Sequence, residues 1–151
     1  MEISNKTYEK SNSITEVSLN KFRSTEYDRL LKDGNRQKDA QALVDYLCKK
    51  FHLPKVRVFV SHCKQEHSVD SNGRLKSRTY GYYRPSVHSI TIYNLTAVKG
   101  QVISIKQFAN TLLHEFMHHY DMTYLKLDAT PHTEGFFKRI SDLQAKLSKQ
   151  G

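Results

Sequence analysis

The sequence predicts a small α+β domain in which one helix precedes three strands and two helices follow them. Apolar residues recur at helical spacing in residues 37–53, short β-branched and aromatic stretches occupy 56–95, and helical spacing returns from residue 105 onward. We expect the three strands to form a mostly antiparallel sheet. The chain has 151 residues, which is enough for one domain with a substantial core.

The N-terminal segment differs in composition from the rest. Residues 1–20 are rich in Ser, Asn, Thr, Lys and Glu, and their apolar residues are scattered. We therefore expect a flexible arm here and a single domain over 21–151. The helix predicted at 37–53 has one apolar stripe that runs up to Pro54, formed by Ala40, Leu43, Leu47 and Phe51.

Three short stretches are typical of strands. Residues 56–62 alternate in polarity, so that one face carries Val56, Val58 and Val60. Residues 78–85 and 86–95 are β-branched or aromatic and meet at a proline, which favours an antiparallel pair. The polar segment 68–77, SVDSNGRLKS, is predicted to be a turn region.

Both C-terminal helices have recognisable starts. Ser104 and Gln107 match an S-x-x-Q capping box ahead of a helix over 105 to about 124. Its apolar residues are spaced four apart: Phe108, Leu112 and Phe116. Thr133 is expected to cap the last helix, whose single apolar stripe comprises Phe136, Ile140, Leu143 and Leu147.

The segment TLLHEFMHHYD, residues 111–121, places three histidines and a glutamate in an otherwise apolar helix. Buried imidazoles cost free energy unless they find polar partners. At about 100° per residue, His118 lies about 40° from His114, so both rings can face one ion. His119 falls near 140°, on another face, and is the least suitable ligand of the three.

His114, Glu115 and His118 form an H-E-x-x-H motif. Its two imidazoles are nitrogen ligands for zinc, and Glu115 can take a proton from a zinc-bound water as general base. Asp121 returns to within about 20° of His114 and is a candidate outer carboxylate that orients an imidazole. An aspartate at such a position is more often an ordinary surface residue.

A catalytic zinc site normally has a third protein ligand. We favour His132, because it directly precedes an amphipathic helix whose phenylalanines most simply pack on the H-E-x-x-H helix. Glu134 is the alternative, although its carboxylate is equally explained by the dipole of the helix that it begins.

At these residues the chain resembles the SprT-like metalloproteases, which include the Spartan-related proteases. The similarity spans about residues 40–145, and its discriminating part is LLHEFMHHYD followed by PHTEGFFKRI. The resemblance implies a zincin-like fold with one Zn²⁺ ion held by His114, His118 and His132, and Glu115 as the catalytic base.

We therefore predict a zinc-dependent endopeptidase that acts on protein or peptide substrates. Strand 88–94 is expected to bind the substrate backbone by β-augmentation. Tyr82, Tyr83 and Tyr120 are candidate oxyanion donors, although a tyrosine in such a segment more often serves packing. One alternative is a regulator-cleaving zincin with a glutamate as third ligand. Another is a non-catalytic, basic nucleic-acid-binding module whose structural metal recruits Cys63.

Charge indicates a second partner. Residues 51–105 hold eight Lys or Arg against two Asp or Glu, which is six of the nine net positive charges. Cations interleaved with tyrosines can bind single-stranded DNA, although a solvated basic face explains them equally well. The candidates are Arg74, Lys76, Arg78 and Arg84. DNA-associated proteins are then candidate substrates.

The chain shows no membrane-spanning run and no signal-peptide pattern, so we expect a cytoplasmic or nucleoid-associated protein. Cys48 and Cys63 are expected to be reduced thiols.

Overall fold

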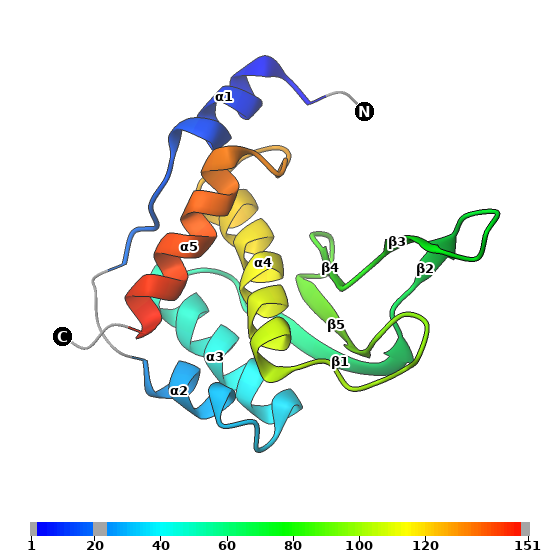
Figure 1. Cartoon of the computed structure of the whole chain (residues 1–151). Helices are drawn as coiled ribbons and strands as arrows, with labels where there is room; N and C mark the ends of the chain where they lie inside the picture. The colour runs from blue at the N-terminus through cyan, green and yellow to red at the C-terminus, as the bar shows by residue number, and fades with distance from the viewer. Residues whose placement is uncertain (1–2, 20–23, 149–151) are drawn as a thin grey trace.

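The computed structural model describes residues 3–19 and 24–148, without the side chains of 76–78 (Figure 1). Five helices are described: α1 (Asn5–Ser13), α2 (Thr25–Leu31), α3 (Arg36–Phe51), α4 (Ile105–Thr123) and α5 (Glu134–Ser148). Five strands lie between α3 and α4: β1 (Arg57–Lys64), β2 (His67–Val69), β3 (Leu75–Arg78), β4 (Gly81–Arg84) and β5 (Ser89–Leu95). The α+β class is confirmed.

The main sheet has the order β1-β5-β4, with β5 parallel to β1 and antiparallel to β4. The expectation of a mostly antiparallel sheet is therefore wrong, because one of its two pairings is parallel. A parallel pair needs a long crossover, and residues 65–88 supply one between β1 and β5. The antiparallel pairing predicted on either side of Pro85 is confirmed.

Strands β2 and β3 form a separate antiparallel ribbon that extends away from the helices (Figure 1). The sequence predicts only a polar turn region at 68–77, and that prediction holds for the tip alone. There, a side-chain oxygen of Asp70 accepts hydrogen bonds from the backbone N–H groups of Asn72 and Arg74, and Gly73 has a φ of 78°. This local bonding closes the turn and lets the flanking residues pair.

Helix α4 lies between the main sheet and α5 (Figure 1). Its start is confirmed, since the Ser104 hydroxyl accepts from the N–H of Gln107 at 3.1 Å. The Gln107 amide instead donates to the hydroxyl of Thr111, so only half of the predicted capping box forms. The cap of α5 is also confirmed, because the Thr133 hydroxyl accepts from the N–H of Phe136 at 3.0 Å.

The hydrophobic core lies between α4 and the elements that pack against it. Its members include the predicted apolar stripes of α3, β1, α4 and α5: Leu43, Leu47, Phe51, Val56, Val58, Phe108, Leu112, Phe116, Phe136, Leu143 and Leu147. Among the described residues, no helix combines the length and the apolar character needed to cross a bilayer.

The N-terminal segment is more ordered than the sequence predicts. Residues 5–13, expected to be part of a flexible arm over 1–20, form α1 and pack on α5. The expectation of a flexible arm is therefore wrong for residues 5–13. The hydrophobic pattern does not indicate this helix because its buried side chains, those of Thr7 and Ser11, are polar. Helix α2 is also additional to the predicted elements; its N-cap is Ser24, and its Leu30 is fully buried.

Candidate metal centre

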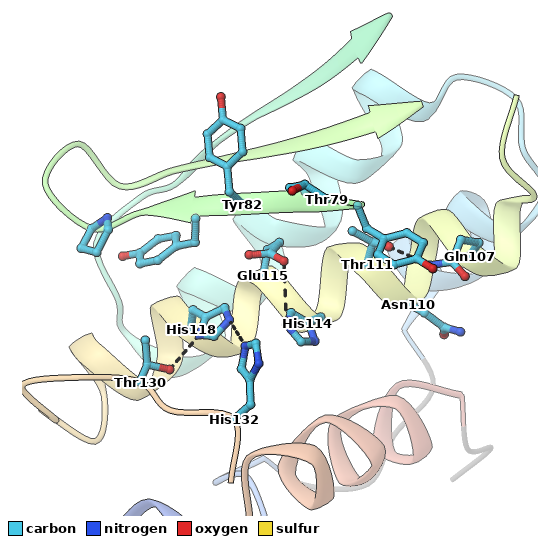
Figure 2. Close-up of a pocket in the computed structure, with 14 residues that line it drawn as sticks. Thr79, Tyr82, Gln107, Asn110, Thr111, His114, Glu115, His118, Thr130 and His132 are labelled. Carbon is cyan, nitrogen blue, oxygen red and sulfur yellow. Dashed lines mark hydrogen bonds and ion pairs between the residues drawn. The ribbon is translucent and has the colours of Figure 1, made fainter. Parts of the chain in front are cut away.

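The H-E-x-x-H residues lie on the face of α4 that is turned toward β4 and the segment before α5 (Figure 2). The rings of His114 and His118 stack edge to face, with centroids 5.1 Å apart. Glu115 lies beside them, with a carboxylate oxygen 3.9 Å from Nε2 of His114. Because the apolar side chains of α4 are packed in the core, they hold this polar strip in place.

His132 completes a cluster of three imidazoles. Its Nε2 lies 3.1 Å from Nε2 of His118 (Figure 2), and the three candidate ligand atoms all lie within 4.8 Å of one another. Zinc–nitrogen bonds of about 2.0–2.1 Å at tetrahedral angles place ligand nitrogens about 3.3 Å apart. The cluster therefore has dimensions that suit a single small ion.

Glu134 is not part of this cluster. Its side chain is exposed, and a carboxylate oxygen forms an ion pair with Nζ of Lys138 at 3.0 Å. Cys63 is exposed near the end of β1 and is not part of the cluster either.

The ring of Phe136 packs against all three imidazoles. This ring is fully buried, and its centroid lies 5.1 Å from that of His114, 4.7 Å from that of His118 and 5.1 Å from that of His132. The expectation that the phenylalanines of the last helix pack on the H-E-x-x-H helix is confirmed for Phe136, whereas Phe137 is about half exposed. The hydrophobic pattern identifies Phe136 as a core residue but gives no sign that it contacts all three rings.

Asp121 reaches His118 through Thr130, a residue that the sequence analysis does not identify. The hydroxyl of Thr130 donates to Oδ2 of Asp121 at 3.1 Å, so its oxygen is left to accept from Nδ1–H of His118 at 2.8 Å. This bonding fixes the tautomer in which Nε2 of His118 carries a lone pair directed at the cluster.

Asp121 is itself held by Arg139, and both side chains are fully buried. The guanidinium donates to both carboxylate oxygens, at 3.1 and 2.8 Å. Burial raises the pKa of Asp121, and the ion pair with Arg139 and the hydrogen bond from Thr130 oppose that rise.

Burial also sets the protonation of the motif residues. Desolvation, with a smaller contribution from the neighbouring imidazoles, lowers the pKa of His114 to about 4 and that of His118 to about 3. Both rings are therefore neutral at pH 7, which is the form that coordinates metals. Desolvation raises the pKa of Glu115 to about 7.

His119 points to the other side of α4, as predicted. It is fully buried, and Nε2–H donates to the carbonyl oxygen of Pro54 at 2.9 Å, which leaves Nδ1 to accept from the hydroxyl of Tyr83 at 2.7 Å. The hydroxyl of Tyr120 accepts from the N–H of Ser18. The hydroxyls of Tyr83 and Tyr120 are thus both bonded away from the cluster. Tyr82 and Tyr83 both line the cleft.

A cleft of about 690 Å³ runs between α4 and β4 (Figure 2). Its lining includes the three imidazoles, Glu115 and much of β4, together with Gln107, Asn110 and Thr111 from the start of α4. The prediction that strand 88–94 binds substrate backbone is wrong, because β5 is paired on both sides. Strand β4 is the edge strand that borders the cleft.

No family model, curated protein or solved structure matches this chain. The information about function lies in the site itself, where three imidazoles and one buried carboxylate meet at an open cleft.

The candidate DNA-binding residues lie on two different elements. Arg74 is exposed at the tip of the β2–β3 ribbon, and Lys76 and Arg78 belong to β3, with side chains outside the described part. Arg84 ends β4, is exposed, and has its guanidinium carbon 5.1 Å from the centroid of the Tyr82 ring. Of the two candidates whose side chains the structure describes, Arg84 is the one that lies directly beside the cleft.

Proposed function

We propose that this protein is a zinc-dependent endopeptidase of the SprT-like kind. The observation that carries the proposal is the convergence of His114, His118 and His132 on one point at the cleft, with Glu115 next to them. Three imidazole ligands with one side open to a cleft are typical of catalytic rather than structural zinc.

The donor set suits zinc. Three imidazole nitrogens favour a borderline-soft ion over Mg²⁺ or Ca²⁺, which prefer oxygen ligands. Zinc bound there would supply Lewis-acid activation of water and of the scissile carbonyl group.

Glu115 would act as the general base. Glu115 as a residue is 7% exposed and lines the cleft, so its carboxylate can take the proton of the attacking water and deliver it to the leaving amine. The three imidazoles would hold the ion, and Phe136 and Thr130 would keep the rings in place.

Strand β4 would position the substrate. Its unpaired edge borders the cleft, and an extended peptide can add to such an edge through backbone hydrogen bonds. Backbone recognition is tolerant of sequence, so we expect the substrates to be unfolded or extended segments of proteins.

The experiment is to compare the wild type with Glu115→Gln. We expect the variant to retain zinc at the wild-type level and to lose cleavage of an unfolded protein substrate, because the amide preserves shape but cannot accept the proton. Zinc content is measured by metal analysis after dialysis. Loss of zinc in the variant would show that Glu115 is a ligand, and unchanged cleavage would show that it is not the base.

We propose as a second function that single-stranded DNA binds beside the cleft, which would bring DNA-associated proteins to the peptidase. The observation that favours this is the pair formed by exposed Arg84 and the cleft residue Tyr82. Such a cation–aromatic pair offers a phosphate contact and a stacking surface together.

A further inference from the structure

We propose that helix α1 is a positioning element of the metal centre. It holds in place the segment that carries Thr130 and His132. The proposal rests on the metal site proposed above. Positioning residues outside the ligand shell commonly change metal affinity because they fix the orientation of the ligands.

The first line of evidence is a set of bonds from α1 to the segment between α4 and α5. The hydroxyl of Thr7 donates to Oδ1 of Asp128 at 2.6 Å, and Nζ of Lys10 donates to the carbonyl oxygen of Leu125 at 3.1 Å. Both acceptors lie in the segment that connects the H-E-x-x-H helix to His132. Helix α1 therefore bonds this segment upstream of Thr130.

The second line of evidence lies at the start of α5. The hydroxyl of Ser11 shares a hydrogen bond of 2.9 Å with that of Thr133, the residue next to His132. The side-chain oxygen of Asn12 accepts from the N–H of Gly135 at 3.2 Å. These two bonds hold the chain just after His132, and those of Thr7 and Lys10 hold it before His132.

The third line of evidence is a chain of hydrogen bonds that leads from α1 through Arg139, Asp121 and Thr130 to His118. Nη1 of Arg139 donates to the carbonyl oxygens of Ser11, at 2.5 Å, and Ile14, at 2.6 Å. Nη2 of Arg139 donates to the hydroxyl of Ser11 at 3.2 Å. The same guanidinium holds Asp121, which accepts from Thr130. Carbonyl oxygens at the end of α1 thus help to fix the cation that organises the bonding of His118.

This arrangement explains why polar residues are the buried ones in α1. Ser11 and Arg139 are both fully buried, and the Ser11 hydroxyl accepts a hydrogen bond from the Arg139 guanidinium. If α1 moved away, the guanidinium would lose the hydrogen bonds to the two carbonyl oxygens and to the Ser11 hydroxyl, and hydrogen bonds to a charged group are among the stronger ones. We therefore expect the conformation of the His132 segment to depend on α1.

The test compares two serine substitutions on the same helix. Ser11→Ala removes the hydroxyl that bonds Thr133 and Arg139, whereas Ser13→Ala removes an exposed hydroxyl that bonds only the carbonyl oxygen of Lys10. Both changes replace serine with a good helix former. We expect Ser11→Ala to weaken zinc binding on the order of 10-fold and Ser13→Ala to leave it within about two-fold of wild type.

Zinc affinity is measured by competition with a chromophoric chelator, at a temperature where circular dichroism shows each variant to be folded. The increase in Tm on adding zinc provides a second readout. A merely structural role would lower the Tm with and without zinc alike, whereas a positioning role reduces the zinc-induced increase. Equal zinc affinities for the two serine variants would overturn the proposal.

Thr7→Val is the reserve variant if Ser11→Ala does not fold. It keeps the shape of the side chain and removes the hydrogen bond to Asp128, so we expect it also to weaken zinc binding. Wild-type zinc affinity in Thr7→Val would count against the proposal. Failure of the wild type to bind zinc is a different result, because it would refute the proposed metal site rather than the role of α1.

Discussion

The hydroxyl oxygen of Thr130 lies 2.8 Å from Nδ1 of His118 and leaves Nε2 of that ring to face the other imidazoles. We predict that Thr130→Val, which preserves shape but cannot accept this bond, weakens zinc affinity about 10- to 100-fold. Thr130→Ser should recover most of the affinity. Competition with a chelator measures the effect, and a Val variant with wild-type affinity would show that the hydrogen bond does not orient the ring.

The third ligand can be tested by single substitutions. We predict that His132→Ala strongly reduces zinc affinity, whereas Glu134→Ala leaves it nearly unchanged, because Glu134 is exposed and paired with Lys138. His119→Ala should also retain zinc, although it should lower the free energy of unfolding because it leaves Tyr83 and Pro54 without their partner. Metal analysis distinguishes these outcomes. Greater zinc loss in Glu134→Ala than in His132→Ala would support the glutamate-ligand alternative.

Gly135 should tolerate no side chain although it lies in a helix. A Cβ atom there would collide with the carbonyl oxygens of Ser11 and Asn12. We predict that Gly135→Ala destabilises the protein by about 1–3 kcal/mol, although alanine normally stabilises a helix interior by about 1 kcal/mol over glycine. Gly34→Ala is the control, since nothing lies within 4 Å of its Cβ position. Denaturant unfolding checks both, and a stabilised Gly135→Ala variant would contradict the close packing of α1 on α5.

The two thiols should differ in reactivity. Burial raises the pKa of Cys48 to about 11, so at pH 8 only about one thiol in a thousand is the reactive thiolate. Cys63 is exposed. We predict that iodoacetamide labels Cys63 alone in the native protein at pH 8, and that Cys48 reacts only after unfolding or as the pH approaches 11. Mass spectrometry of wild type and Cys63→Ser provides the measurement. Native labelling of Cys48 at the rate of Cys63 would contradict its burial.

Single-stranded DNA binding is predicted to be weak, tolerant of sequence and steeply dependent on salt, because it releases counterions from phosphates. Neutralising Arg74, Lys76, Arg78 and Arg84 together should diminish it. A matched control neutralises four exposed lysines on helices or at their ends: Lys6, Lys32, Lys38 and Lys49. Fluorescence anisotropy with a labelled oligonucleotide gives the affinities. Equal losses in both variants would indicate an effect of net charge alone, and no binding by the wild type at low salt would refute the proposal.

The sequence predicts well the parts of this site that depend on local rules. Ser104 and Thr133 cap the helices as expected, and the helical period brings His114 and His118 to one face while His119 faces Tyr83. These features depend on residues only a few positions apart. The juxtaposition of His132 with them also follows, because an amphipathic helix directly after it must pack on the core.

Features that depend on distant partners could not be predicted in this way. Alternation identifies the strands but not their neighbours, so the parallel pairing of β1 with β5 gives no local signal. Helix α1 has no apolar stripe, because it docks through hydroxyl and carbonyl groups onto Arg139 and Thr133. Thr130 is likewise an ordinary loop residue until the fold places it between His118 and Asp121.

The bonds between Ser11 and Arg139 join positions that are 128 residues apart in the chain. Closing so long a loop has an entropic cost that only the finished contacts offset, so α1 should dock late in folding. During synthesis, the ribosome releases α1 long before Arg139 or His132 has been added. A growing chain therefore carries the H-E-x-x-H helix without its third imidazole and without the cation that orders Asp121. A peptidase assembled in this order would stay inactive toward its own nascent chain and its neighbours until translation had passed the last helix.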